Sequence, residues 1–264
     1  MEQTSTISLE KWRQISKAHF SSITPYYDQG RAFEQGRPWV EEIQRNTPVG
    51  ELDWVLDVGC GTGLFATEFS RQMKARVIGI DPARAMLRHA LKKERPSNLN
   101  WSQGAAESLP FANETLQAVF LSQVWHHLIG QEGAGREFLR CLKPGGGLYI
   151  KTYSHAQLKA RWDLREIFPE LMPLMLQIYP DVSHMSTLLK EIGFSSVTTK
   201  STSKEDFMRP SQMLKLMREK AWSMFSFLSP EGIAEGEARL NALIATGDQP
   251  VLYPEVHLLV IARR

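Results

Sequence analysis

Cysteine is scarce in this sequence: the chain has 264 residues and only two cysteines, Cys60 and Cys141. Two isolated thiols cannot form a disulfide framework, and neither stands at metal-ligand spacing, so we expect no metal site. An excess of charge of either sign is also absent, because 31 Lys and Arg residues nearly balance 29 Asp and Glu residues. No basic block is present, and electrostatics therefore give no reason to expect a nucleic-acid partner.

Long apolar runs are missing as well. The longest late run, Leu258 to Ala262, is far shorter than the ~18 residues that a membrane-spanning helix needs. The polar start of the chain, Met1 to Thr6, lacks the apolar core of a secretory signal. The composition, 42% hydrophobic and 23% charged, is that of a globular protein. We therefore expect a soluble cytoplasmic protein without a membrane span.

Short runs rich in Val, Ile and Leu alternate with helical patterns through the chain. Continuous apolarity within a run indicates a strand buried on both faces, as in a parallel sheet covered by helices. The alternation predicts a doubly wound α/β architecture. The expected strands are Trp54–Val58, Arg76–Ile80, Leu99–Ser102, Ala118–Ser122, Leu148–Thr152, Ser196–Lys200 and His257–Ala262.

Two regions lie outside this alternation, and they suggest three parts. Residues 1–46 are expected to form an N-terminal helical lid, and residues 47–155 the ligand-binding core. Residues 156–264 are expected to complete the sheet and to carry two helical insertions, 156–192 and 206–246, as a cap for a substrate. Seven of the ten methionines fall in this last part. They favour either an adaptable apolar pocket or ordinary helix cores.

A glycine-rich turn follows the first expected strand. Gly59, Gly61 and Gly63 alternate with other residues directly after that strand, and a helix from Leu64 to Met73 is expected next. Glycines allow a tight turn and a close approach of a ligand to the main chain, and the helix N-terminus presents unpaired N–H groups. Asp81 ends the next strand, twenty residues after Gly61. An acid at this position of a nucleotide-binding fold accepts hydrogen bonds from ribose hydroxyls.

The spacing of the glycines separates two kinds of cofactor. A dinucleotide fingerprint is G-x-G-x-x-G, whereas here the glycines stand at alternate positions and Leu64 follows the last one. Asp57 precedes the first glycine, where a carboxylate would repel a pyrophosphate but attract an ammonium group. The pattern therefore predicts a nucleoside joined to an amino acid.

Four motifs stand in register over residues 52–152. They are Val55–Gly63, Gly79–Pro82 with Met86, Gly104–Phe111 and Leu142–Gly147, accompanied by Trp125–Leu128 after the fourth strand. Together they resemble the class I S-adenosylmethionine-dependent methyltransferases, and the similarity is greatest to the small-molecule group (methyltransferase type 11) that includes ubiquinone and menaquinone biosynthesis enzymes. The resemblance implies a Rossmann-like, doubly wound sheet of seven mostly parallel strands, the last one antiparallel, with helical cap insertions.

The resemblance also implies positions for the cofactor, S-adenosylmethionine. Its methionine part would be held by Asp57, by the turn of Gly59, Cys60, Gly61 and Gly63, and by Ser122. Its ribose would be held by Asp81, and its adenine would be bordered by Pro82, Met86, Ala105, Ala106 and Glu107. Tyr27 and Arg31 would close the site. The family often has Asp where this chain has Ala105, and alanine cannot accept a hydrogen bond from the adenine amino group.

The expected function is methyl transfer to a small or medium-sized organic acceptor, at an O, N or C atom, by a monomer or homodimer. The candidates for a catalytic residue are His126 and His127, whose adjacent side chains should point in different directions and make a poor metal pair. Two alternatives stay open. One is a methyltransferase that acts on RNA or protein, and the other is a non-catalytic protein that binds S-adenosylmethionine.

Overall fold

The computed structural model describes residues 9–21, 27–28, 36–128, 130–253 and 255–264. The chain divides into two compact units. The helical unit consists of Met1–Phe33, Tyr153–Pro180 and Ser201–His257. The sheet unit consists of Glu34–Thr152, Asp181–Lys200 and Leu258–Arg264.

The sheet has seven strands in the order β3-β2-β1-β4-β5-β9-β6. Strand β1 lies between β2 and β4 and pairs in parallel with both, while β3 and β5 add parallel strands outside them. Strand β9 runs antiparallel to β5. The predicted fold class, a mostly parallel doubly wound sheet with its last strand antiparallel, is therefore confirmed. The strands are β1 (Trp54–Val58), β2 (Arg76–Asp81), β3 (Leu99–Gln103), β4 (Leu116–Ser122), β5 (Leu142–Thr152), β6 (Ser196–Lys204) and β9 (Glu255–Arg263).

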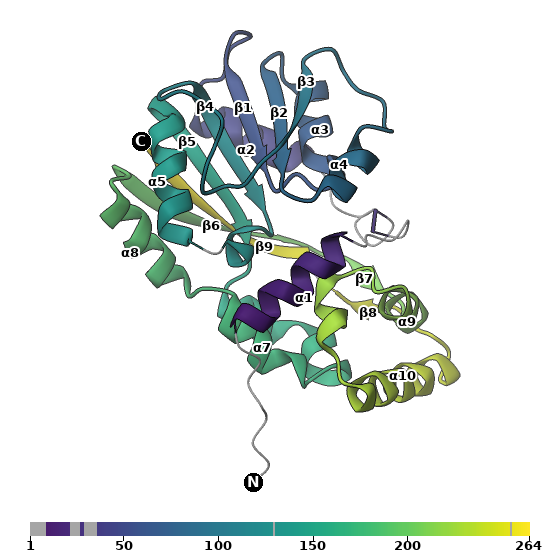
Figure 1. Ribbon diagram of the computed structural model, residues 1–264. Coiled ribbons are helices and arrows are strands. Elements are labelled where there is room, and N and C mark those ends of the chain that lie inside the picture. The colour runs from purple at the N-terminus through teal and green to yellow at the C-terminus, as the bar shows by residue number, and fades with distance from the viewer. Residues whose placement is uncertain (1–8, 22–26, 29–35, 129, 254) are drawn as a thin grey trace. The chain divides into compact units, whose positions relative to one another are not determined.

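Helices cover both faces of this sheet, as Figure 1 shows. Alternate residues of the central strands join different cores: Val55 packs with α2 and α3, and Leu56 packs with α5 and α8. Both side chains are fully buried. This double burial explains why the strands are continuously apolar in sequence. The helices of the unit are α2 (Arg37–Asn46), α3 (Leu64–Gln72), α4 (Arg84–Ala90), η2 (Trp125–His127), α5 (Gln131–Cys141) and α8 (Val182–Ile192).

The helical unit has its own apolar core. Met175, Met213 and Met217 are at most 4% exposed in it, next to Trp12 and Phe168. These three methionines are therefore packed in helix cores, one of the two interpretations that the sequence left open. The elements of the unit are α1 (Leu9–Ser21), α6 (His155–Ala160), η3 (Asp163–Ile167), α7 (Leu171–Ile178), β7 (Phe207–Met208), α9 (Pro210–Arg218), η4 (Ser223–Phe227), α10 (Pro230–Ala245) and β8 (Val251–Leu252).

The two compact units divide the chain differently from the expected three parts. Helix α2, expected in the lid of residues 1–46, belongs to the sheet unit, because Trp39 and Ile43 are buried against the same core as Phe120. Helix α8, expected in the insertion of residues 156–192, also belongs to the sheet unit, where Leu189 packs in the same core as Phe138 of α5. In both cases the amphipathic stripe of the helix joins the sheet.

Within the described ranges, no helix is both long enough and apolar enough to cross a membrane.

Candidate functional site

The strand order reverses between β1 and β4. From β1 the chain proceeds outward to β2 and β3, and it then returns to β4 and β5 on the other side. In open α/β sheets this switch point, at the carboxyl ends of the strands, is where ligands bind. The glycine turn follows β1 at this edge, and Val124 follows β4. A Cβ atom added to Gly59 would lie 2.5 Å from Cγ2 of Val124, so the two connections touch.

The glycine turn requires glycine for its conformation. The φ angles of Gly59, Gly61 and Gly63 are 65°, 55° and 83°, all in the left-handed region that side chains disfavour. Backbone hydrogen bonds fix the turn to β2, because the N–H groups of Gly59 and Cys60 both donate to the carbonyl oxygen of Ile80 at 2.8 and 3.1 Å. The turn is therefore a rigid backbone surface at the switch point.

The ring of Trp101, on β3, packs against the other side of the turn. A Cβ atom added to Gly63 would lie 2.3 Å from Cη2 of Trp101, and one added to Gly79 would lie 2.5 Å from Cζ3. Sequence reasoning missed this residue. A signal was available, since Gly79 and Trp101 are register partners on β2 and β3, and a glycine opposite a tryptophan indicates that the ring crosses the neighbouring strand.

Asp81 connects β2 to the glycine turn. Its Oδ2 accepts a hydrogen bond from the Gly61 N–H at 2.8 Å, and its Oδ1 accepts one from the Ala83 N–H at 2.7 Å. Burial raises the pKa of this carboxyl group, which is 7% exposed, and the two N–H donors act in the opposite direction. Each oxygen keeps a second lone pair, so the carboxylate can still accept from ribose hydroxyls. Helix α4 begins after these contacts, at Arg84.

Asp57 lies under the turn and is 1% exposed. Its Oδ2 accepts a hydrogen bond at 3.0 Å from the N–H of Ala66, in the first turn of α3. This contact satisfies a helix N-terminal donor and places negative charge at the positive end of the helix. Asp57 therefore supports the turn, and its contact with the cofactor ammonium stays a prediction. Burial, followed by the charges of Asp57 and Asp81, raises the pKa of Cys60 and keeps that thiol protonated.

The residues predicted to border adenine gather beside Asp81. The N–H of Gly104 donates to the Asp81 carbonyl at 3.3 Å, and Gln103 donates to the Pro82 carbonyl at 3.2 Å. Met86 and Ala106 are 2% and 5% exposed. Pro82 and Ala105 are exposed, and Glu107 is half-buried. The structure thus brings these residues together, while their contacts with adenine stay predictions.

The carboxyl ends of β4 and β5 carry two buried hydroxyl groups. Ser122, on β4, is 6% exposed and Thr152, on β5, is fully buried. Neither Ser122 Oγ nor Thr152 Oγ1 has a hydrogen-bond partner among the described residues. Buried hydroxyls are normally satisfied, so the Ser122 hydroxyl, at the end of the switch-point strand β4, is left for a polar ligand. The register partner of Ser122 on β5 is Lys151, so the Thr152 side chain points to the opposite face of the sheet.

The two histidines lie on η2, directly after β4. Their ring centroids are 4.2 Å apart with an interplanar angle of 40°, so the expectation that the rings point in different directions is wrong. The tight turn of η2 brings the two tilted rings close together. Burial, and after it the charge of His127, lowers the pKa of His126 well below its ordinary value. His126 is therefore neutral at pH 7.

Tyr27 and Arg31 were predicted to close the site. Tyr27 belongs to the helical unit, where its ring meets Phe20 edge-on with centroids 6.4 Å apart. Arg31 lies outside the described residues. Among the described residues, no group of three or more His, Cys, Asp and Glu side chains is arranged to hold a metal ion.

The donor set fits an amino acid joined to a nucleoside. The left-handed glycine turn leaves the main chain open to a carboxylate, and the orphaned Ser122 hydroxyl can meet an amine. Asp81 has lone pairs left for paired hydroxyls. This edge of the sheet is thus suited to S-adenosylmethionine.

Comparison with known proteins agrees with this geometry. Residues 56–150 match a family model described as a methyltransferase domain. The chain is 29% identical over 214 residues to 2-phytyl-1,4-naphtoquinone methyltransferase of Thermosynechococcus vestitus, covering 69% of this chain and 91% of that protein. It is 27% identical over 206 residues to demethylmenaquinone methyltransferase of Lactococcus lactis, covering 67% of this chain and 81% of that protein.

A solved structure from Anabaena variabilis, described as a methyltransferase of an antibiotic biosynthesis pathway, shares the fold with a TM-score of 0.68. It is 18% identical and covers 87% of this chain and 99% of its own. The motifs in register, the switch-point geometry and these matches agree, and together they support a class I S-adenosylmethionine-dependent methyltransferase.

Proposed function

We propose that this enzyme methylates a small or medium-sized apolar organic acceptor, and that a reduced naphthoquinone is the acceptor class to test first. Two relatives matched over most of their length are named as naphtoquinone and demethylmenaquinone methyltransferases. The near balance of charges supports a small acceptor over RNA. Both cysteines are free, in agreement with a cytoplasmic location.

The observation that carries the cofactor half of this proposal is the hydrogen bond from Gly61 N–H to Asp81. It fixes a carboxylate and an open glycine turn next to each other at 2.8 Å. Asp81 would accept from the ribose hydroxyls, and the turn would hold the methionine part. The hydroxyl of Ser122 would meet the ammonium group. When bound, S-adenosylmethionine supplies an electrophilic methyl group on a sulfonium.

The chain's own contribution to the transfer is chiefly orientation. A nucleophile held ~3–3.5 Å from the methyl and in line with it needs little further catalysis. His126 is neutral at pH 7 and buried, so it can orient an acceptor but is a weak base. A reduced quinone ring carries electron-rich carbon and oxygen atoms, either of which can attack a sulfonium methyl.

The first test is ligand binding. A thermal unfolding scan with S-adenosylhomocysteine, with NAD as the control, should show a shift for S-adenosylhomocysteine alone. A ligand at a hundred times its dissociation constant adds ~2.7 kcal/mol to the free energy of unfolding. A shift with NAD alone would contradict the cofactor assignment.

The second test is transfer of a labelled methyl group from S-adenosylmethionine. A reduced, prenylated 1,4-naphthoquinone, total RNA and a protein extract are offered in parallel. Label in the quinol product supports the proposal, and mass spectrometry then identifies the methylated atom. Label only in RNA or protein, or binding without any transfer, contradicts it. Asp81→Asn should lose transfer, whereas Asp53→Asn, whose carboxylate pairs with Lys143 at 2.6 Å before β1 begins, should keep it.

A further inference from the structure

The segment between β3 and β4 is held by side chains from elsewhere in the sheet unit. It begins at Gly104, beside Asp81, and carries the residues predicted to border adenine, 105–107. Leu109 is 5% exposed and Phe111 is partly buried against the same core, but the other positions from 110 to 115 are exposed or half-buried and contribute little apolar burial. A segment of this kind opens locally unless polar contacts hold its backbone.

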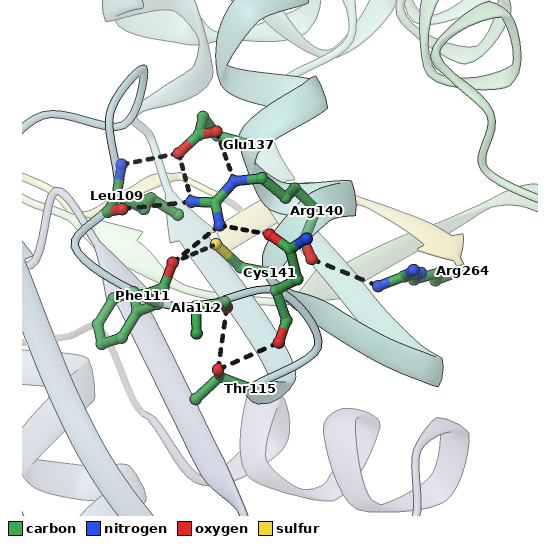
Figure 2. A network of polar contacts seen from close by, with 9 residues as sticks. Leu109, Phe111, Ala112, Thr115, Glu137, Arg140, Cys141 and Arg264 are labelled. Atoms are coloured by element: carbon green, nitrogen blue, oxygen red, sulfur yellow. Dashed lines mark hydrogen bonds and ion pairs between the residues drawn. The ribbon is translucent and has the colours of Figure 1, made fainter.

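Glu137 and Arg140 of α5 supply these contacts, as Figure 2 shows. Arg140 donates to the carboxylate of Glu137 through both Nε and Nη2, each at 2.8 Å. It also donates to the backbone carbonyls of Leu109 at 3.3 Å and Phe111 at 2.8 Å, and to Asn113 Oδ1 at 2.9 Å. Glu137 Oε2 accepts from the Leu109 N–H at 3.0 Å. The pair therefore holds both polar groups of the Leu109 backbone.

The C-terminal residue secures the far end of the same segment. Arg264 Nη2 forms an ion pair with Glu114 at 2.6 Å. The Arg264 guanidinium also donates to the carbonyl of Leu142, and the Glu114 N–H donates to the Arg140 carbonyl at 3.0 Å. Charge-assisted contacts thus fix the backbone from residue 109 to residue 114.

Residues 105–107 lie between two fixed points. On one side the Gly104 N–H is bound to the Asp81 carbonyl, and on the other side Leu109 is bound by Glu137 and Arg140. Ala105 has no side-chain acceptor, so the adenine amino group has to be met by backbone groups of this segment or by the neighbouring Glu107. Such recognition depends on where the backbone is held.

We infer that Glu137 and Arg140 are positioning residues for the cofactor, because they hold residues 105–107 in the conformation that receives adenine. This inference rests on the proposed cofactor site. It assigns to α5 a role in cofactor affinity that does not involve contact with the cofactor. The pair is partly exposed, with side-chain exposures of 22% and 32%, and ion pairs in such positions contribute little to global stability. Its effect should therefore be on the local segment.

The test compares two ligands that share the adenine. Calorimetric titration measures binding of S-adenosylhomocysteine and of 5′-methylthioadenosine, which lacks the amino acid part. Arg140→Ala and Glu137→Gln should each lower the affinity for both ligands about tenfold, which is the effect of losing one charge-assisted hydrogen bond. The KM for S-adenosylmethionine should rise by a similar factor, while kcat at saturation stays unchanged.

A matched control lies on the same helix. Arg136 pairs with Glu132 at 2.7 Å, and both side chains are well exposed, at 59% and 62%. Arg136→Ala removes an arginine from α5 without touching the segment, so its affinities should equal those of the wild type. Arg140→Lys keeps the charge but loses the planar fork, and it should resemble Arg140→Ala.

Three results would overturn the inference. The first is unchanged affinity for both ligands in the Arg140 and Glu137 variants. The second is a loss confined to S-adenosylhomocysteine, and the third is an equal loss in Arg136→Ala. Should Arg140→Ala fail to fold, Glu137→Gln decides, since it keeps the shape of the side chain. Failure of the wild type to bind S-adenosylhomocysteine would instead contradict the proposed cofactor site itself.

Discussion

The contact between Gly63 and Trp101 gives the sharpest prediction. In Gly63→Ala the new methyl group would lie 2.3 Å from Cη2 of Trp101, and the residue would have to keep a φ angle of 83°. A left-handed conformation costs about 1–2 kcal/mol for a residue with a Cβ atom. Forcing a methyl group into a packed site costs about 1–3 kcal/mol more. We therefore expect a loss of about 2–5 kcal/mol in the free energy of unfolding.

Gly145→Ala is the matched control. Gly145 has a φ angle of 76°, but a Cβ atom there would have nothing within 4 Å. This variant should lose only the conformational part, about 1–2 kcal/mol. Urea denaturation followed by circular dichroism gives both values. Combining Gly63→Ala with Trp101→Leu should then cost less than the sum of the two single changes, because the shorter side chain vacates the space.

The reasoning would be refuted if Gly63→Ala were no more destabilising than Gly145→Ala, or if the double variant were simply additive. Either result would mean that the ring of Trp101 moves freely and does not limit the turn. Calorimetric titration of the same variants with S-adenosylhomocysteine supplies a second measurement. A shifted turn in Gly63→Ala should weaken the binding of S-adenosylhomocysteine. Gly145 lies near the start of β5, away from the turn, so Gly145→Ala should bind this ligand as the wild type does.

Three further predictions concern charged and titratable groups. Asp81→Asn should weaken S-adenosylhomocysteine binding at least tenfold in calorimetry, because an amide presents a donor to one of two N–H groups; equal affinity would remove Asp81 from the site. Asp163→Ala removes the fully buried partner of Arg161, whose side chain is 17% exposed, and should cost about 3–5 kcal/mol in urea denaturation, a value that a loss below 1 kcal/mol would contradict. The folded pKa of His126 is lowered, so below about pH 6.5 only the unfolded chain takes up this proton and stability falls as the pH drops toward 5. His126→Asn should reduce that slope, and an unchanged slope would show that His126 is not responsible.

Much of the sheet unit could be predicted from local sequence patterns. A strand buried on both faces needs apolar residues at every position, so β1 and β4 were recognisable without any knowledge of their partners. The glycine turn was recognisable for a similar reason, since three alternating glycines after a strand have few uses other than left-handed backbone. The kind of ligand, a nucleoside joined to an amino acid, followed from their spacing and from Asp57 and Asp81, and the resemblance of four motifs to a known family implied S-adenosylmethionine.

Side-chain directions and partners could not be predicted in the same way. Asp57, whose contact with the cofactor ammonium stays a prediction, also accepts a hydrogen bond from Ala66 at the start of α3, which the sequence did not indicate. His126 and His127 were expected to point apart, yet their ring centroids lie 4.2 Å apart. In each case a neighbour that is close in space, or a tight local turn, decided the direction of a polar group whose type alone was visible in the sequence.

The sequence by itself determined the strands, the glycine turn and the acid that ends the second strand, because these depend on periodicity and on local backbone chemistry. Only the tertiary structure decided which core each helix joins, that Trp101 limits the turn, and that Glu137 and Arg140 hold the adenine-side segment. Those features depend on register between strands and on contacts between residues far apart in the chain. Such contacts form only in the folded protein, and they produce no periodic pattern in the sequence from which they could be predicted.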